Sequence, residues 1–174
     1  MLTELIHSIW GAVHVAAAVA ALILGPILFL RAKGGRSHRQ LGYAYVAAMV
    51  VTCLAGLPMD AFGPVSPFHI LSIVSLVTIS LGAGFIVFGA RLARSEKTRK
   101  GLTAGHMQFM AWSYIGLAAA GLAQVGSRLV ADSVVFGLPG WGAVIAASAL
   151  TIAAGALLIR RAEPRLAARY YPDA

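Results

Sequence analysis

Four histidines at repeated places in an apolar chain are the residues that could do chemistry. His38 and His106 each open a phrase of the form H-x-Q-[LF] that follows a run of basic residues. His14 and His69 lie near the starts of the apolar stretches that precede these phrases. Imidazole nitrogens ligate haem iron, zinc and copper. Facing pairs of these histidines would therefore bind a haem or a metal ion.

The surroundings of each histidine also allow a structural role. His14 lies among alanine and valine, where an unpaired imidazole is costly, so it either ligates or hydrogen-bonds to a neighbouring helix. His69 lies nearer a membrane interface, where water can satisfy it. His38 stands beside Arg39, and the two can bind lipid phosphates instead. If haem is bound, Arg39 is the expected partner of its propionates.

Two further residues are weaker candidate ligands. Met110 lies one helical turn after His106, and methionine ligates both haem iron and copper, although it is also ordinary core filler. His7 precedes His14 by seven residues, about two turns, and so shares its helical face. We expect His7 to be an interfacial residue unless it replaces His14 or His69 in the outer pair.

The composition is that of an integral membrane protein. Of the 174 residues, 59% are hydrophobic and 11% charged, and the mean hydropathy is +0.82. Soluble domains are about a quarter charged. The net charge of +8 would suggest a nucleic-acid partner in a soluble protein, but here the positive-inside rule explains it, so no nucleic acid is expected. The single cysteine, Cys53, excludes an intramolecular disulfide.

Five apolar stretches predict five transmembrane helices and an all-α fold. About 20 residues are needed to cross the hydrocarbon layer of a bilayer. The expected helices are Ile6–Leu30, Gln40–Met59, Pro67–Arg91, Thr103–Leu129 and Trp141–Ile159.

The basic residues predict the orientation. All but one of the 14 lie in segments 31–39, 91–100 and 160–169, which alternate with loops that carry no lysine. In a bacterial inner membrane this places the N-terminus outside and the C-terminus in the cytoplasm. The spans hold no lysine, which argues against a retinal Schiff base. They hold no deep carboxylate, which argues against a proton-coupled or cation-coupled transporter.

The repeated phrases predict a four-helix core in a single membrane domain. Residues 1–60 and 61–130 would form two hairpins related as a parallel repeat, 131–160 a fifth helix, and 161–174 a cytoplasmic tail. Such a core would pair His14 with His69 in the outer leaflet and His38 with His106 near the cytoplasmic face. His14 and His69 differ in their distance from the helix starts, so their depths do not match well.

The segment from His38 to Val46 and the segment from His106 to Met110 resemble a family of small predicted bacterial membrane proteins of unassigned function. The shared pattern is H-R-x-x-G-x-x-Y after the first helix, followed later by a histidine–methionine segment. The resemblance covers about residues 10–130 and leaves out the fifth helix. The layout of the histidines is also similar to that of transmembrane di-haem cytochromes b, including the ascorbate-dependent ones, where paired histidines hold one haem per leaflet. That likeness implies haem binding by analogy of arrangement alone.

The leading hypothesis is a membrane-embedded b-type haem protein. One or two haems would pass electrons between a quinol or other donor and an acceptor across the membrane, as a cytochrome or oxidoreductase. One alternative is a zinc- or copper-binding membrane protein that uses the same histidines. Another is a non-catalytic accessory subunit of a membrane complex. The expected surroundings are the lipid bilayer, a quinone or redox partner, and either further copies of the chain or a larger membrane complex.

Overall fold

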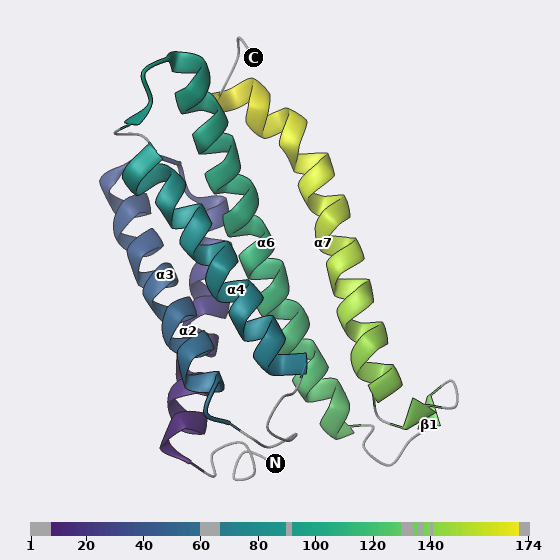
Figure 1. Ribbon diagram of the computed structural model, residues 1–174. Coiled ribbons are helices and arrows are strands. Elements are labelled where there is room, and N and C mark those ends of the chain that lie inside the picture. Colours follow the sequence, from purple (N-terminus) through teal and green to yellow (C-terminus); the bar gives the residue numbers. More distant parts are fainter. Residues whose placement is uncertain are drawn as a thin grey trace. The chain divides into compact units, whose positions relative to one another are not determined.

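The computed structural model describes residues 8–59, 67–89, 92–129, 134–135, 138–139 and 141–170. Five long helices make up nearly all of this part (Figure 1). They are α2 (Ile9–Leu30), α3 (Arg36–Gly56), α4 (Pro67–Gly84), α6 (Glu96–Leu129) and α7 (Trp141–Tyr170). A π-helical turn, η1 (Phe85–Gly89), continues α4. The predicted all-α class is confirmed, with one short antiparallel pair, β1 (Val134–Val135) and β2 (Leu138–Pro139), before α7.

Helices α3, α6 and α7 have boundaries that differ from the predicted ones. Helix α3 runs from Arg36 to Gly56 instead of from Gln40 to Met59. Helix α6 begins at Glu96 instead of Thr103, and α7 continues to Tyr170 instead of ending at Ile159. An apolar run marks only the part of a helix that faces lipid. Glu, Lys and Arg are good helix formers, so charged turns extend α6 and α7 beyond their apolar parts.

Four helices in the described part are long and apolar enough to cross a membrane. They are Ile9–Leu30, His69–Gly89, Glu96–Gly126 and Val144–Ala162. Helix α3 is the one predicted span that is not in this group. Because α3 ends at Gly56, every 18-residue window inside it includes Arg39 and Gln40. It packs along α2, which lies in the group, and its 21 residues span about 32 Å, close to the hydrocarbon thickness.

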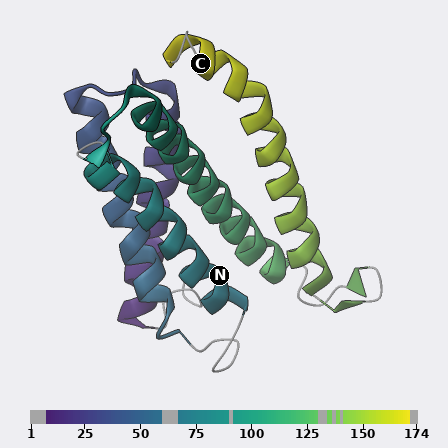
Figure 2. The same ribbon diagram turned by 45° about the horizontal axis from the view of Figure 1, so that its top comes forward.

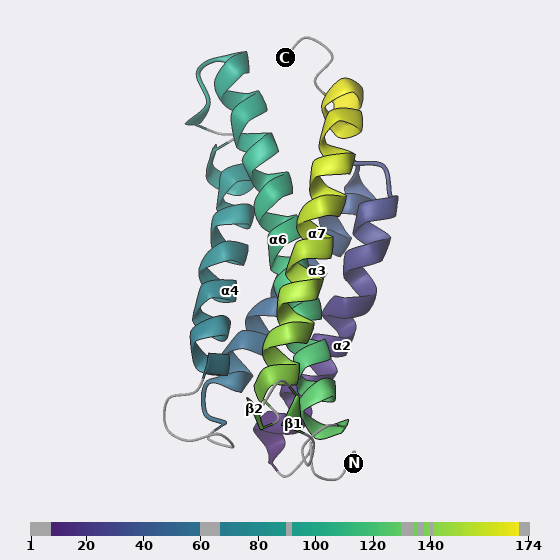
Figure 3. The same ribbon diagram turned by 90° about the vertical axis from the view of Figure 1, so that its right-hand side faces the viewer.

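Contacts divide the chain into two compact units, Met1–Ala83 and Gly84–Ala174. In the first unit, α2 and α3 form the first predicted hairpin and lie antiparallel (Figure 3). Small residues make up most of the buried face of α2: Ala17, Ala21 and Gly25 follow one another at intervals of four, and Gly11 lies six residues before Ala17. Helix α3 buries larger side chains, Tyr45, Met49 and Cys53. Small residues let helix backbones approach closely, which is what drives helix association in lipid.

A short turn joins α2 to α3. Gly34 has φ of +83°, a conformation that costs glycine little. Lys33 folds back, and its Nζ donates hydrogen bonds to the carbonyl oxygens of Leu28 (2.6 Å) and Phe29 (3.0 Å). These are among the last carbonyls of α2, which have no partner within the helix. The lysine therefore caps α2 and tightens the turn before α3.

In the second unit, α6 and α7 form an antiparallel hairpin (Figure 2). A Cβ added to Gly155 of α7 would lie 2.5 Å from Cδ1 of Ile115, so glycine is what allows α7 to approach α6 there. The π-helical turn η1 also packs on α6. Whether the two hairpins form a four-helix core stays a prediction.

Candidate histidine site

His14 is held by the helix that packs beside it. Its Nδ1 lies 2.8 Å from the carbonyl oxygen of Thr52 on α3. A carbonyl can only accept, so Nδ1 carries the proton and the neutral ring keeps its lone pair on Nε2. Within the described part of the chain, that Nε2 makes no hydrogen bond. This is the hydrogen-bonded alternative expected for His14, and it is also how metal-ligating histidines are commonly oriented.

Three helices meet around the ring of His14. A Cβ added to Gly56 of α3 would lie 3.1 Å from His14 Nδ1 and 3.4 Å from Ser72 Oγ of α4. Ser72 follows His69 by three residues, so the two share a face of α4. Neither Gly56 nor Ser72 was among the predicted site residues. The spacing of Ser72 from His69 was a usable signal, whereas the role of Gly56 depends on tertiary contacts.

His69 caps the end of α3. Its Nε2 lies 3.0 Å from the carbonyl oxygen of Leu57, the C-cap residue of α3. His14 and His69 thus bind the same helix end, where the carbonyls carry partial negative charge. Their acceptors are five residues apart, about 7.5 Å along the helix, so the expected mismatch in depth is present.

His14 of the predicted outer pair and His38 of the predicted inner pair lie far apart within the first unit. His38 lies in the first turn of α3, 14 residues before Thr52, which is about 21 Å along the helix. His14 and His38 therefore cannot share one metal ion. His38 is half-buried with its Nδ1 inside, whereas Arg39 is exposed. The predicted polar loop around His38 is in fact the start of α3.

His106 belongs to the second unit and lies deeper in its helix than predicted. Because α6 begins at Glu96, His106 is ten residues inside it, about 15 Å from the helix start. His38, in contrast, is only two residues inside α3, so the phrases H-x-Q-[LF] do not occupy equivalent places. His106 and Met110 are both half-buried on α6.

The turn of α6 that holds His106 packs against η1. A Cβ on Gly105 would lie 3.0 Å from the ring of Phe85, and one on Gly89 would lie 2.9 Å from Leu102. The rings of Phe85 and Phe109 meet edge to face, with their centroids 5.4 Å apart. No residue pattern predicted this π-helical turn, a feature that occurs often at functional sites.

The described residues contain no group of three or more His, Cys, Asp or Glu side chains that could hold a metal ion. Axial ligation of haem needs only two side chains. His7 lies outside the described residues.

The helices and their apolar composition define a multi-pass helical membrane protein. Residues 11–160 match the family described as "Predicted membrane protein (DUF2306)", and the chain belongs to that family. The match includes the fifth helix, which the resemblance seen in the sequence left out. No curated protein and no solved structure matches the chain.

Proposed function

We propose that this protein binds b-type haem in the membrane and passes electrons between a quinol or other donor and an acceptor. The observation that carries the proposal is the hydrogen bond from His14 Nδ1 to Thr52. That bond fixes the ring and its tautomer and leaves Nε2, the nitrogen with the lone pair, for iron.

The second ligand of the outer haem would be His69, which lies against the same end of α3. In the structure, His69 uses Nε2 to bind Leu57, so ligation through Nε2 requires that bond to be exchanged. At the inner tier, His38 and His106 would ligate, and Arg39 would neutralise the propionates. The bilayer would be a bacterial inner membrane, with the basic segment 31–39 on the cytoplasmic side.

The test is an absorption spectrum of the detergent-purified protein, oxidised and reduced, after expression with ample haem. A Soret band is expected. His14→Ala should remove the outer haem and His106→Ala the inner one, while Thr78→Ala, which changes another polar residue of a span, should remove neither. If both histidine variants remove the same signal, only one haem is bound. A protein without Soret absorption contradicts the proposal.

A zinc or copper site at the same histidines is the second candidate. The observation in its favour is the bond from His69 Nε2 to Leu57, since zinc and copper accept imidazole through either nitrogen. Elemental analysis of the purified protein separates this candidate from haem.

An accessory subunit of a membrane complex is the third candidate. Its support is that His14 and His69 both have carbonyl partners and so are satisfied without a ligand. It predicts no cofactor, together with partner subunits that co-purify in fixed ratio.

A further inference from the structure

The turn between α2 and α3 is basic and has no acidic residue near it in the sequence. Its cations are Arg31, Lys33, Arg36 and Arg39. Residues 8–59, which include both helices of the hairpin, contain no Asp or Glu. At the start of α6, in contrast, Glu96 lies 3.5 Å from Lys100 and offsets part of the local charge. The α2–α3 turn therefore cannot be neutralised by a carboxylate of its own hairpin.

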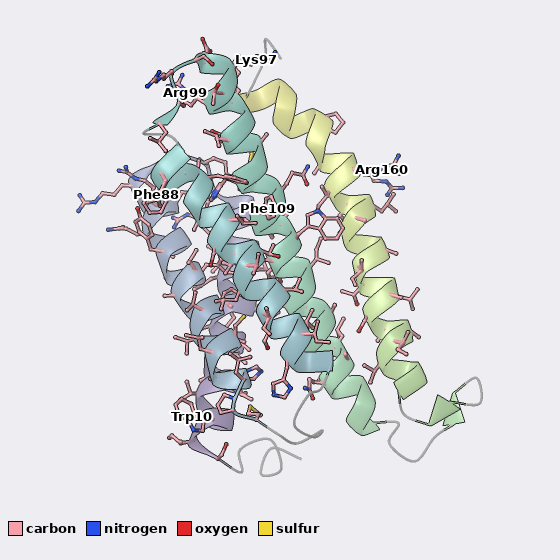
Figure 4. All side chains as sticks on the ribbon, in the orientation of Figure 1. Trp10, Phe88, Lys97, Arg99, Phe109 and Arg160 are labelled. Atoms are coloured by element: carbon pink, nitrogen blue, oxygen red, sulfur yellow. The ribbon has the colours of Figure 1, made fainter. Side chains whose placement is uncertain are left out.

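The length of α2 places this turn at the level of the lipid headgroups. Helix α2 is a candidate span of 22 residues, about 33 Å long, against about 30 Å for the hydrocarbon layer. Trp10 lies at the end of α2 that is away from the turn (Figure 4), and it is 53% exposed, as is typical of a tryptophan at a membrane interface. Trp10 and Arg31 are about 32 Å apart along the helix, so they bracket the hydrocarbon layer.

Within the turn, the side chain of Arg31 is directed toward α3. Its Nη1 donates a hydrogen bond of 2.8 Å to Oγ of Ser37, which lies in the first turn of α3. This bond brings the guanidinium of Arg31 to the residue that follows Arg36. Arg31 and Arg36 are both exposed, and the side chain of Arg36 makes no hydrogen bond or ion pair in the part of the chain that the structure describes.

Two guanidinium groups at one place suit a phosphate. Each guanidinium has five N–H donors, and the bond of Arg31 to Ser37 uses only one of them. Arginine binds phosphate oxygens through two parallel hydrogen bonds, which fix the geometry as well as add binding energy. Lys33 is less available, because its Nζ caps the carbonyls of α2.

The face of α3 below the turn indicates that the phosphate belongs to a lipid. Arg36, Arg39 and Tyr43 are exposed and follow one another at intervals of three and four, so they share one face of the helix. Tyr43 is 65% exposed and lies about 10 Å along the helix from Arg36, toward the hydrocarbon layer. A tyrosine at this depth contacts acyl chains with its ring and headgroups with its hydroxyl. A small anion in water would not reach both Arg36 and Tyr43, whereas a phospholipid would.

We propose that the α2–α3 turn binds an anionic phospholipid, with Arg31 and Arg36 on the phosphate and Tyr43 beside the glycerol and the start of an acyl chain. Clusters of Lys and Arg directly after a transmembrane helix are a common means of binding anionic lipids. The inference goes beyond the proposed function and does not depend on haem. Arg39, the proposed partner of the propionates, is left unchanged in the test.

The test is a titration of the detergent-purified full chain with phosphatidylglycerol, followed by native mass spectrometry, which gives the Kd of the first bound lipid. Replacing Arg31 and Arg36 together by Gln should raise this Kd about tenfold. Replacing Lys97 and Arg99 by Gln removes the same charge from the start of α6 (Figure 4) and should change the Kd by less than about twofold.

Two single variants separate the parts of the site. Arg36→Gln leaves the bond of Arg31 to Ser37 in place, so the turn keeps its structure, and the Kd should rise about threefold. Tyr43→Ala changes no charge. It should weaken phosphatidylglycerol binding about threefold and leave the binding of glycerol 3-phosphate, which has no acyl chain, unchanged.

Three outcomes would overturn the proposal. Equal effects of the two double variants would mean that binding follows net charge and not the turn. Glycerol 3-phosphate that binds as tightly as phosphatidylglycerol would make the turn a site for soluble phosphates. Phosphatidylcholine that binds as tightly, with the same dependence on Arg31 and Arg36, would remove the selectivity for anionic lipid. Circular dichroism should show equal helix content in all variants.

Discussion

Gly56 decides how firmly His14 is held. A methyl group at Gly56 would lie 3.1 Å from Nδ1 and 3.2 Å from Cε1 of the ring. The ring cannot retreat freely, because Nδ1 is bonded to Thr52 of the same helix. We expect Gly56→Ala to lower the free energy of unfolding by about 1–2 kcal/mol, as overpacking commonly does, measured by thermal unfolding in detergent.

Gly42 supplies the control for that prediction. It lies in the same helix, and an added Cβ meets nothing within 4 Å. Gly42→Ala should stabilise the protein by up to about 1 kcal/mol through helix propensity. If Gly56→Ala is equally harmless, the ring of His14 is not confined as described.

The position of the proton on the His14 ring can also be measured. The carbonyl of Thr52 requires Nδ1–H, so nitrogen NMR of labelled protein without cofactor should find Nε2 unprotonated at a pH where the ring is neutral. Gly56→Ala should populate the other tautomer as well. A spectrum in which Nε2 carries the proton in the unaltered protein would contradict the orientation on which the haem proposal depends.

Between elements, the contact of α6 with α7 depends on Gly155. An added Cβ would lie within 2.5–2.9 Å of three carbons of Ile115. Gly155→Ala should therefore cost about 1–3 kcal/mol in unfolding experiments. Ile115→Ala removes the obstacle, so the double variant should lose less than the sum of the single ones, by about 0.5 kcal/mol or more. Gly126→Ala is the control, because an added Cβ there meets no atom within 4 Å. If the effects of Gly155→Ala and Ile115→Ala are additive, Gly155 and Ile115 do not touch.

The helices could be predicted because an apolar run of about 20 residues matches the thickness of a bilayer and is rare in soluble domains. The charged ends of the helices could not be predicted in this way, because hydropathy reports contact with lipid and not backbone hydrogen bonding. The hydropathy pattern therefore predicted a loop at Glu96–Lys100, which is helical, and with it too shallow a position for His106. The four histidines could be selected by residue type and place. Their partners, the carbonyls of Thr52 and Leu57, belong to the backbone of another helix, which no side-chain pattern specifies.

At the scale of the whole molecule, the crossing of α3 determines the orientation of everything after it. Helix α3 is the one long helix of the described part that fails the length and hydropathy requirement for a span, yet its packing on α2 implies that it crosses too. If it does, Arg36 at the start of α3 and Lys97 at the start of α6 lie on one side of the membrane, and Trp10 lies on the other. If α3 stayed on one side, Arg36 and Lys97 would be on opposite sides.

Cysteine labelling distinguishes these cases, and the single buried Cys53 makes it simple, since Cys53→Ala gives a background without thiols. Trp10, Arg36 and Lys97 are all exposed and suit substitution by cysteine. An impermeant maleimide should label Arg36→Cys and Lys97→Cys in inverted vesicles only, and Trp10→Cys in right-side-out vesicles only. Labelling of Arg36→Cys and Lys97→Cys from opposite sides would show that α3 does not cross the membrane. It would also place His38 and His106 on opposite faces, where they could not ligate one haem.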